Sequence, residues 1–384
     1  MPRTVFVTGT LPDGGAERHT ISLLRALAAR GHECHAVCVK PTEATATSLH
    51  LAPSSLTCLQ ATRYLDLAAA RRFSELLKAI RPQVIVAANP YALLYASLGR
   101  VRARSSARLI VTFHSASALN LKEQAQMLAY RPLFWGADCT VFLSERQRRY
   151  WRRRALSSPR NVVIHNGIDA GHFRLQPRTW PNEQLRRSLG FASTDFVIGL
   201  PALLRKEKNH QQLLRAVAAL RKLEVPARAL VIGDGEMRPV IEDLARQLGI
   251  GEHVTITGLQ TDVRPYIAAC DVVTLCSLSE TFSLAALEAM AMGRPVVLSD
   301  VGGAAEMVVP GWNGLLYPVG NSIDYVNCLL RLSDSASARS MGRHARVMVE
   351  QRFSAELMTD RYEGLLAQLC GKQSAREMTP ASGL

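Results

Sequence analysis

Short apolar runs alternate with amphipathic stretches along the whole chain. In the first half, such runs predict buried strands at residues 5–8, 33–39, 84–88, 109–113, 140–143 and 162–165. A second series predicts strands at residues 196–200, 229–232, 254–257, 272–276 and 295–299. Buried strands that alternate with helices are typical of parallel sheets with helices on both faces. The pattern therefore predicts an α/β protein.

The two series of strands predict two domains. A chain of 384 residues is long enough for both. The pattern weakens over residues 171–190, which include Pro177 and Pro181, and a linker is expected there. The first domain then covers residues 1–170 and the second covers residues 190–353, followed by a helix at about 354–370 and a flexible tail at 371–384.

The segment after the strand at residues 272–276 carries two spaced acids. Glu280 is expected on the loop between this strand and a helix at residues 284–292, and Glu288 lies about one turn into that helix. Carboxylates accept hydrogen bonds from hydroxyl groups, and the free N–H groups at the start of a helix attract anions. A ligand with many hydroxyl groups beside a phosphate fits this arrangement, which is the chemistry of a sugar nucleotide.

The same segment resembles a known family. Glu280 and Glu288, followed by Ala-Met-Ala-Met-Gly-Arg-Pro-Val-Val and by Gly-Gly-Ala-Ala-Glu at 302–306, match the pattern of the retaining glycosyltransferases of family 4. A weaker likeness extends over nearly the whole chain. The resemblance implies the GT-B fold, which has two Rossmann-like domains facing each other across a cleft and a C-terminal helix that crosses back to the first domain. It also implies that the first domain binds the acceptor and the second binds the nucleotide-sugar donor.

The resemblance implies roles for residues around the two acids. Glu288 would hold the ribose hydroxyls of the nucleotide, and Glu280 would lie close to the transferred sugar. Backbone N–H groups at Phe282, Ser283 and Leu284 would face a phosphate or the sugar. The family usually has glycine on both sides of the phenylalanine, whereas this chain has Thr and Ser there. Their larger side chains would narrow the sugar pocket and so affect which donor sugar is accepted.

Two cations follow the strand at residues 196–200. Lys208, with Asn-His after it, is in register with the family's Arg-Leu-x-x-x-Lys-Asn-His, so the resemblance implies that it meets the diphosphate. Leu203 stands at the family's arginine position, and Arg205 lies two residues later. Cations here would neutralise a leaving diphosphate. The alternative is a solvated charge cluster.

Glycines follow several predicted strands. Gly14 and Gly15 open the first helix, where glycine lets the backbone approach a ligand; an ordinary tight turn is the alternative. The family uses this loop near the donor diphosphate and the acceptor. Gly233, Gly258 and Leu259 follow later strands, and the resemblance places them near the nucleotide. The chain lacks a Gly-x-Gly-x-x-Gly dinucleotide fingerprint.

His114 follows the strand at residues 109–113, at the edge where α/β sheets place ligands. A lone histidine is more often structural than functional. Its position resembles that of a histidine which many family members point at the donor sugar. The resemblance therefore makes it a candidate catalytic residue beside Glu280, Lys208 and Arg205.

The charge of the chain is concentrated in its first half. The net charge is +14; residues 1–170 hold 23 Lys and Arg against 10 Asp and Glu, a net of +13, and the remainder holds +1. The densest run lies at residues 146–154, with six arginines, Tyr150 and Trp151. A solvated helix face and a surface for anionic lipid headgroups are both open interpretations. Nucleic acid is not expected, because no nucleic-acid-binding module accompanies the charge.

Other features bear on the location of the protein. No apolar run reaches the ~18–20 residues of a membrane span, and the start of the chain predicts a strand instead of a signal peptide. Eight scattered cysteines without a Cys-x-x-Cys motif predict reduced thiols and no metal site. A cytoplasmic protein is expected, peripheral on the inner face of the plasma membrane if the basic run binds lipid.

The predicted function is a metal-independent, retaining glycosyltransferase of the hexosyltransferase type. The expected donor is a nucleotide sugar, UDP-sugar before GDP-sugar, and the expected acceptor is a glycan or a lipid-linked molecule of polysaccharide or lipopolysaccharide synthesis. No cofactor is expected, and no metal, because the chain has no Asp-x-Asp motif. The alternatives are a sugar-nucleotide epimerase of the same fold and a non-catalytic glycosyltransferase-like partner subunit, which the departures at Leu203, Thr281 and Ser283 favour. A nicotinamide dehydrogenase is more distant.

Overall fold

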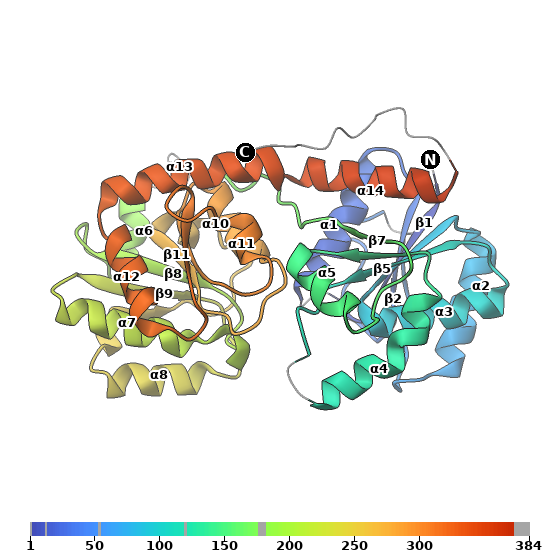
Figure 1. Cartoon of the computed structure of the whole chain (residues 1–384), viewed down its shortest axis with the longest axis horizontal. Helices are drawn as coiled ribbons and strands as arrows, with labels where there is room; N and C mark the ends of the chain where they lie inside the picture. Colours follow the sequence, from blue (N-terminus) through green and yellow to red (C-terminus); the bar gives the residue numbers. More distant parts are fainter. Residues whose placement is uncertain (1, 12–13, 53–54, 119–120, 176–181, 372–384) are drawn as a thin grey trace. The chain divides into compact units, whose positions relative to one another are not determined.

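The chain forms two compact units. The computed structural model describes residues 2–11, 14–52, 55–118, 121–175 and 182–371. Unit 1 comprises Met1–His165 and the segment from Glu356 onward, and unit 2 comprises Asn166–Ala355 (Figure 1). Each unit has its own parallel sheet with helices packed against it. The expectation of two parallel α/β domains is confirmed.

Unit 1 contains a parallel sheet that is seven strands wide within the described residues. The strands are β1 (Thr4–Thr8), β2 (Cys34–Cys38), β3 (Leu56–Cys58), β4 (Val84–Ala88), β5 (Arg108–Phe113), β6 (Cys139–Phe142) and β7 (Asn161–Val163). Their order is β3-β2-β1-β4-β5-β6-β7. Strands β2 and β3 therefore lie on one side of β1, and β4 to β7 lie on its other side. The position between β1 and β4, where the strand order reverses, is a topological switch point.

Helices cover both faces of this sheet because alternate strand residues point to opposite sides. The helices are α1 (Gly15–Ala29), α2 (Leu67–Ile80), α3 (Asn89–Ala103), α4 (Leu121–Trp135), α5 (Glu145–Arg152) and α14 (Ala355–Leu369). Val5 and Val7 of β1 lie in one core with residues of α2, α3 and α4. Phe6, between them, lies in a second core with residues of α1 and α14.

The last helix belongs to the first unit. Met358, Tyr362 and Leu366 of α14 are buried in the core that contains Phe6. The expected return of a C-terminal helix to the first domain is therefore confirmed.

Unit 2 repeats the architecture with six strands among its described residues. They are β8 (Phe196–Pro201), β9 (Ala227–Ile232), β10 (Val254–Ile256), β11 (Val272–Leu275), β12 (Val296–Ser299) and β13 (Gly314–Tyr317), in the order β10-β9-β8-β11-β12-β13. Its helices are α6 (Asn182–Ser188), α7 (His210–Lys222), α8 (Arg238–Gln247), α9 (Arg264–Ala269), α10 (Leu284–Ala291), α11 (Ala304–Met307), α12 (Ser322–Leu332) and α13 (Ser335–Arg352), with short 3-10 turns η2 (Lys206–Lys208) and η3 (Gly251–His253). The switch point lies between β8 and β11.

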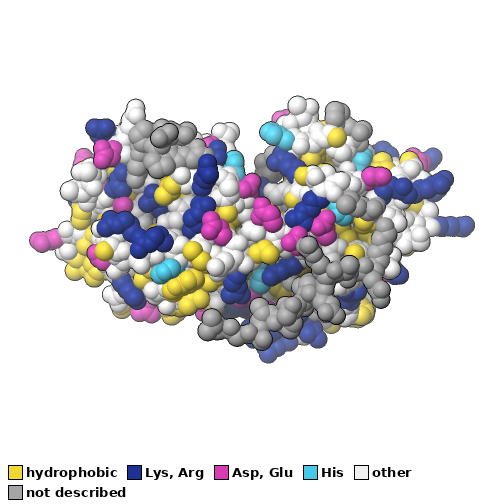
Figure 2. Space-filling view, turned by 90° about the horizontal axis from the view of Figure 1, so that it is seen from above, with side chains coloured by type: hydrophobic (Ala, Val, Ile, Leu, Met, Phe, Trp, Pro, Cys, Tyr) yellow, Lys and Arg dark blue, Asp and Glu magenta, His cyan; other side chains and the backbone are white. Residues whose placement is uncertain are grey.

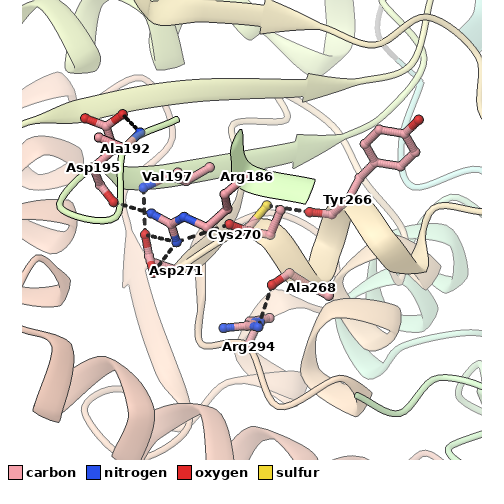
Figure 3. A network of polar contacts seen from close by, with 10 residues as sticks. Arg186, Ala192, Asp195, Val197, Tyr266, Ala268, Cys270, Asp271 and Arg294 are labelled. Atoms are coloured by element: carbon pink, nitrogen blue, oxygen red, sulfur yellow. Dashed lines mark hydrogen bonds and ion pairs between the residues drawn. The ribbon is translucent and has the colours of Figure 1, made fainter. Parts of the chain in front are cut away.

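The segment predicted as a linker contains part of unit 2. Residues 176–181, including Pro177 and Pro181, lie outside the described residues, but α6 follows them. Arg186 of α6 is 8% exposed, and its guanidinium lies 3.1 Å from the Asp271 carboxylate (Figure 3). Asp271 in turn accepts from the backbone N–H of Val197 at 2.8 Å. One buried cation thus ties α6 to the starts of β8 and β11.

All the strands expected from the sequence are present, and the described part of the chain forms two more, β3 and β13. β3 was not predicted because it directly follows the turn-favouring residues Pro-Ser-Ser at 53–55 in the sequence. β13 was not predicted because it begins at Gly314 in a segment rich in turn residues. Both pair at an edge of their sheet, where a short strand suffices.

The surface carries charges of both signs. On the face drawn in Figure 2, Lys and Arg side chains are interspersed with Asp and Glu, and hydrophobic side chains are scattered among them. Among the described helices, none combines the length and the apolar character that crossing a membrane requires. All eight cysteines are free thiols.

Candidate functional site

The predicted residues of unit 2 follow strands on both sides of its switch point. β8 ends at Pro201 and leads to the loop with Arg205 and Lys208, and β11 ends at Leu275 and leads to the loop with Glu280. β8 and β11 are neighbours in the sheet, so both loops leave the same edge side by side. Open α/β sheets bind ligands at this position.

An ion pair joins the two loops. The Lys208 Nζ lies 2.5 Å from the Glu280 Oε2, and both side chains are about one quarter exposed, at 23% and 24%. The backbone also connects the loops, because the N–H of Leu278 donates to the carbonyl of Glu207 at 2.8 Å. The structure therefore brings together two candidates that lie far apart in sequence, and both remain accessible to a ligand.

Gly302 packs closely against the backbone of Glu280. Gly302 has a φ of +53°, and a Cβ at this position would lie 1.8 Å from the carbonyl oxygen of Glu280. The next residue, Gly303, donates its N–H to the carbonyl of Thr281 at 2.7 Å. The Gly-Gly pair noted in the sequence therefore supports the backbone of the acidic loop, because no larger residue fits at 302.

Glu288 lies on α10, directly after this loop. Its side chain is almost completely buried, at 1% exposed. The hydroxyl of Ser283 caps the helix by accepting from the N–H of Ala286 at 3.3 Å. The Ser283 hydroxyl therefore caps its own helix, and Ser283 lines a small pocket together with Glu280. Leu284 begins α10, so its N–H lies in the first turn.

Phe282 is held by an asparagine that begins unit 2. The ring of Phe282 is 3% exposed, and its carbonyl accepts from the amide nitrogen of Asn166 at 2.7 Å. Asn166 is also buried. Asn166 therefore fixes the backbone beside Glu280.

Glycines of the neighbouring loops serve close backbone packing. Gly233 has a φ of +149°, and a Cβ there would lie 2.2 Å from the carbonyl oxygen of Ala202. The N–H of Leu204 donates to the carbonyl of Asp234 at 2.9 Å, and Gly233 forms a bridge with Gly258. These glycines therefore hold the loops after β8, β9 and β10 together. Leu259, next to Gly258, is 70% exposed at the same edge.

Arg205 differs in position from Lys208. Its side chain is exposed and lines a pocket of about 180 Å³ together with Lys206, His210 and Met237. His210 is 2% exposed, and burial, with a smaller effect from the charge of Lys208, lowers its pKa to about 4. His210 was not selected from the sequence, because a histidine at a helix start gives no signal of burial.

The predicted residues of unit 1 also lie at a carboxyl edge. Gly14 is the N-cap residue of α1, and a Cβ added to Gly15 would meet no atom within 4 Å, so the backbone there lies open. His114 follows β5, and its backbone N–H donates to the Asn89 side chain at 2.9 Å. Gly14 and His114 thus follow β1 and β5, the strands on either side of β4.

Two residues around His114 were not predicted. The rings of His19 and His114 meet edge to face with centroids 5.0 Å apart, and the His19 Nε2 lies 3.2 Å from the Tyr362 hydroxyl. Burial and then the neighbouring His19 lower the pKa of His114 well below its usual value, so this imidazole is neutral near pH 7. Tyr362 comes from the last helix, and no local pattern could have paired it with His114.

A separate groove lies away from the candidate site. A groove of about 800 Å³ in unit 1 is lined by Lys78, Arg81, Arg104 and Gln368. It also includes Gln83, which directly precedes β4, so it lies at the amino ends of the strands. Ligand sites of open α/β sheets lie at the opposite edge, and this groove is not part of the candidate site.

Comparison with known proteins decides the family. Residues 13–172 match Glycosyltransferase Family 4, and residues 181–348 match Glycosyl transferases group 1. The chain is 31% identical over 287 residues to EpsD of Bacillus subtilis, which carries the name of a glycosyltransferase; the match covers 70% of this chain and 74% of EpsD. The chain belongs to the group 1 glycosyltransferases of family 4.

Two further relatives match over a shorter stretch of the chain. The N-acetyl-alpha-D-glucosaminyl L-malate synthase of Bacillus anthracis is 33% identical over 202 residues, which are 52% of each protein. The D-inositol 3-phosphate glycosyltransferase of Stackebrandtia nassauensis is 37% identical over 192 residues, which are 47% of this glycosyltransferase and 42% of the other. The chain therefore spans only about half of the length of these two relatives.

Solved structures confirm the GT-B fold of this glycosyltransferase. Anabaena HepE in complex with UDP and glucose superimposes with a TM-score of 0.83 at 21% identity, covering 96% of this chain and 100% of that one. Sucrose-phosphate synthase from Thermosynechococcus elongatus superimposes with a TM-score of 0.81 at 24% identity, covering 97% and 100%.

Proposed function

We propose that this glycosyltransferase transfers a hexose from a UDP-sugar with retention of the anomeric configuration. The observation that carries the proposal is the Lys208–Glu280 pair at the switch point of unit 2, with the buried Glu288 on the helix that follows. A cation and two carboxylates at the edge of a sheet, beside a helix start, match the charges and hydroxyls of a nucleotide sugar.

Each residue has a proposed task in donor binding. The ammonium of Lys208 stabilises the β-phosphate, and Arg205 adds a second positive charge from the same loop. Glu288 accepts hydrogen bonds from the ribose hydroxyls. Glu280 orients Lys208 and accepts a hydrogen bond from a hydroxyl of the transferred sugar.

The residues expected around the donor have supporting tasks. The backbone N–H groups of Phe282, Ser283 and Leu284 face the phosphates or the sugar at the start of α10. The loops at Gly233, Gly258 and Leu259 receive the nucleoside. The open backbone at Gly14 and Gly15 receives the diphosphate and the acceptor.

The proposed reaction needs no strong protein base. The bond between the anomeric carbon and the diphosphate oxygen breaks, and the acceptor oxygen forms its bond on the same face of the sugar. The leaving diphosphate takes the proton of the acceptor hydroxyl. The positioning of the two substrates and the positive charge of Lys208 lower the activation barrier of the transfer. Lys208 thus neutralises the diphosphate, a task for which other enzymes use a divalent metal. His114, which is neutral, donates a hydrogen bond to the sugar.

Several observations support the choice of donor and acceptor. HepE has been crystallised with UDP and with UDP-glucose, which favours UDP over GDP. The lipopolysaccharide outer core galactosyltransferase WaaB has a similar fold, with a TM-score of 0.73 at 19% identity. Together with the net charge of +13 in residues 1–170, this favours an anionic or lipid-linked glycan acceptor at the cytoplasmic face of the membrane, in polysaccharide or lipopolysaccharide synthesis.

Nucleotide binding tests the donor proposal. Calorimetric titration with UDP, GDP, ADP and NAD should give selective binding of UDP. The variant Glu288→Ala should weaken that binding by at least about tenfold, because two hydrogen bonds to the ribose are lost. Glu252→Ala, at an exposed acid of the same unit, is the matched control and should bind as wild type.

The opposite results would overturn the proposal. Binding of GDP, ADP or NAD in preference to UDP would contradict the donor assignment. Equal binding of UDP by wild type and Glu288→Ala would contradict the ribose contact.

A further inference from the structure

Helix α4 has an apolar outer face. Leu121, Leu128 and Trp135 lie seven residues apart, so they share one side of the helix. Their exposures are 81%, 48% and 55%. Ala125 and Pro132, which are also exposed, lie between them on the same side. The result is an apolar stripe along the whole length of α4, which lies at the lower edge of unit 1 in Figure 1.

The core of unit 1 does not account for this stripe. The opposite side of α4 carries Tyr130 and Phe134, which are buried in the core, and Met127 and Leu133, which pack against it. A surface helix of a globular domain normally has one apolar face for the core and one polar face for water. Helix α4 has a second apolar face turned outward, which marks an interaction surface.

Basic side chains adjoin the end of the stripe. The indole N–H of Trp135 donates to the carbonyl of Ala155 at 3.0 Å, and the Arg131 Nε donates to the carbonyl of Arg154 at 2.9 Å. These two bonds place the end of α4 against the turn after α5. Arg152, the last residue of α5, and Arg153, the first residue of that turn, are exposed.

The aromatic residues of the basic run are largely covered by the protein. Trp151 is 1% exposed, and its indole N–H donates to the carbonyl of Ser115 at 2.7 Å. Tyr150 is half-buried, and its ring lies 3.7 Å below the guanidinium of Arg154. The aromatic side chains of residues 146–154 therefore offer little surface to lipid, and the interpretation of this run as a lipid-binding surface depends on its arginines. The exposed apolar groups come from α4 and the exposed arginines from α5.

We propose that the α4 stripe and the arginines at the end of α5 form a docking surface for an anionic membrane. Peripheral binding to a membrane requires two contributions: apolar side chains that enter the membrane–water interface, and basic side chains that contact anionic headgroups. A neutral partner fits this surface less well, because the stripe ends in a cluster of cations. The proposal builds on the lipid-linked acceptor above: α4 starts from the carboxyl edge of the sheet, just after His114, where such an acceptor would arrive.

Vesicle binding by the full chain tests the surface. Co-sedimentation with vesicles of phosphatidylcholine and phosphatidylglycerol at low salt should show binding, and vesicles of phosphatidylcholine alone should bind far less. Leu121→Ser with Leu128→Ser should lower the partition coefficient by at least about tenfold, because both side chains leave the lipid. Arg152→Glu with Arg153→Glu should lower it by a similar factor.

Matched controls lie on unit 2. Ile323→Ser removes an apolar side chain that is 76% exposed, and Arg215→Glu reverses an exposed charge; both should bind vesicles as wild type. UDP titration of the same preparations separates this test from that of the donor site, because vesicle binding and nucleotide binding are measured independently.

Two outcomes would overturn the proposal. One is equal vesicle binding by wild type and the double serine variant. The other is a concentration-dependent dimer that the double serine variant abolishes, without any binding to vesicles, which would assign the stripe to a second copy of the chain.

Discussion

Gly302 occupies a position that tolerates no side chain, because the carbonyl of Glu280 lies where a Cβ would stand. The geometry of the acidic loop thus depends on a residue that has no functional group. The same holds for Asn166, whose amide fixes the backbone at Phe282. At the residue scale, the candidate site consists of a few charged groups and of small or polar residues that hold the backbone behind them.

Replacement of Gly302 should therefore damage both stability and activity. Gly302→Ala combines a left-handed φ of +53° with a close contact to Glu280, and we expect a loss of about 2–4 kcal/mol in the free energy of unfolding. Urea denaturation measures this loss. Gly320→Ala is the control: its φ is +79° but nothing lies within 4 Å, so the cost should stay near 1 kcal/mol. Equal losses in the two variants would contradict the close contact.

His210 should make stability depend on pH. Its pKa is about 4 in the folded state and about 6.5 when unfolded, so between these values the unfolded chain binds a proton that the folded chain does not. Stability is then complete above about pH 6.5 and falls by about 3 kcal/mol as the pH drops toward 4.

Denaturation at about pH 7 and about pH 5 measures this dependence. His210→Asn should reduce the difference between the two conditions, whereas His50→Asn, at an exposed histidine, should leave it as in wild type. An unchanged difference in His210→Asn would show that other groups cause the acid sensitivity.

At the scale of elements, the loops after β8, β9, β10 and β11 form one connected layer. Backbone bonds join the loop of Glu207 to that of Leu278, and the loop of Leu204 to that of Asp234. The carboxyl edge of the sheet is therefore rigid where the proposed donor binds. The opposite edge is held by side chains, through Arg186 and Asp271 (Figure 3).

Loss of Arg186 should destabilise unit 2 without changing the donor site. Arg186→Ala leaves the partly buried Asp271 without its cation, which should cost about 1–3 kcal/mol. Thermal and urea unfolding would show the loss, and UDP affinity should stay within twofold of wild type. Arg187→Ala, at the exposed neighbour, should lie within about 0.5 kcal/mol of wild type. A large fall in UDP affinity for Arg186→Ala would contradict the view that the amino and carboxyl edges of the unit 2 sheet are stabilised independently.

At the scale of the whole molecule, the arrangement of strands could be predicted because buried parallel strands are continuous apolar runs. The resemblance to the family also located Lys208, Glu280 and Glu288, two of which the structure joins directly. The sequence did not predict the helix α6 inside the expected linker, because α6 is short and is anchored by contacts of Arg186 with residues that are distant in sequence.

Other features could not be predicted because they depend on distant contacts. His19 and Tyr362 are 343 residues apart in sequence, so no local pattern brings them together beside His114. Trp151 is buried because it packs in the core of unit 1 and donates to the carbonyl of Ser115, and the arginines around it in sequence give no sign of these contacts. The outward face of α4 was missed for a different reason: an apolar residue at any one position on a helix is usually assigned to the core.

Lys208 is proposed to assist the departure of UDP from a donor held at the switch point of unit 2. The measurement that tests this role most directly is the release of UDP from UDP-glucose and related UDP-sugars by the purified full chain, with water as acceptor. Wild type should release UDP, and Lys208→Ala should do so about 10²–10³ times more slowly, because the developing charge on the diphosphate loses its cation. Lys222→Ala, at the end of α7, should match wild type. Equal rates for wild type and Lys208→Ala, or no release from any UDP-sugar, would contradict this role.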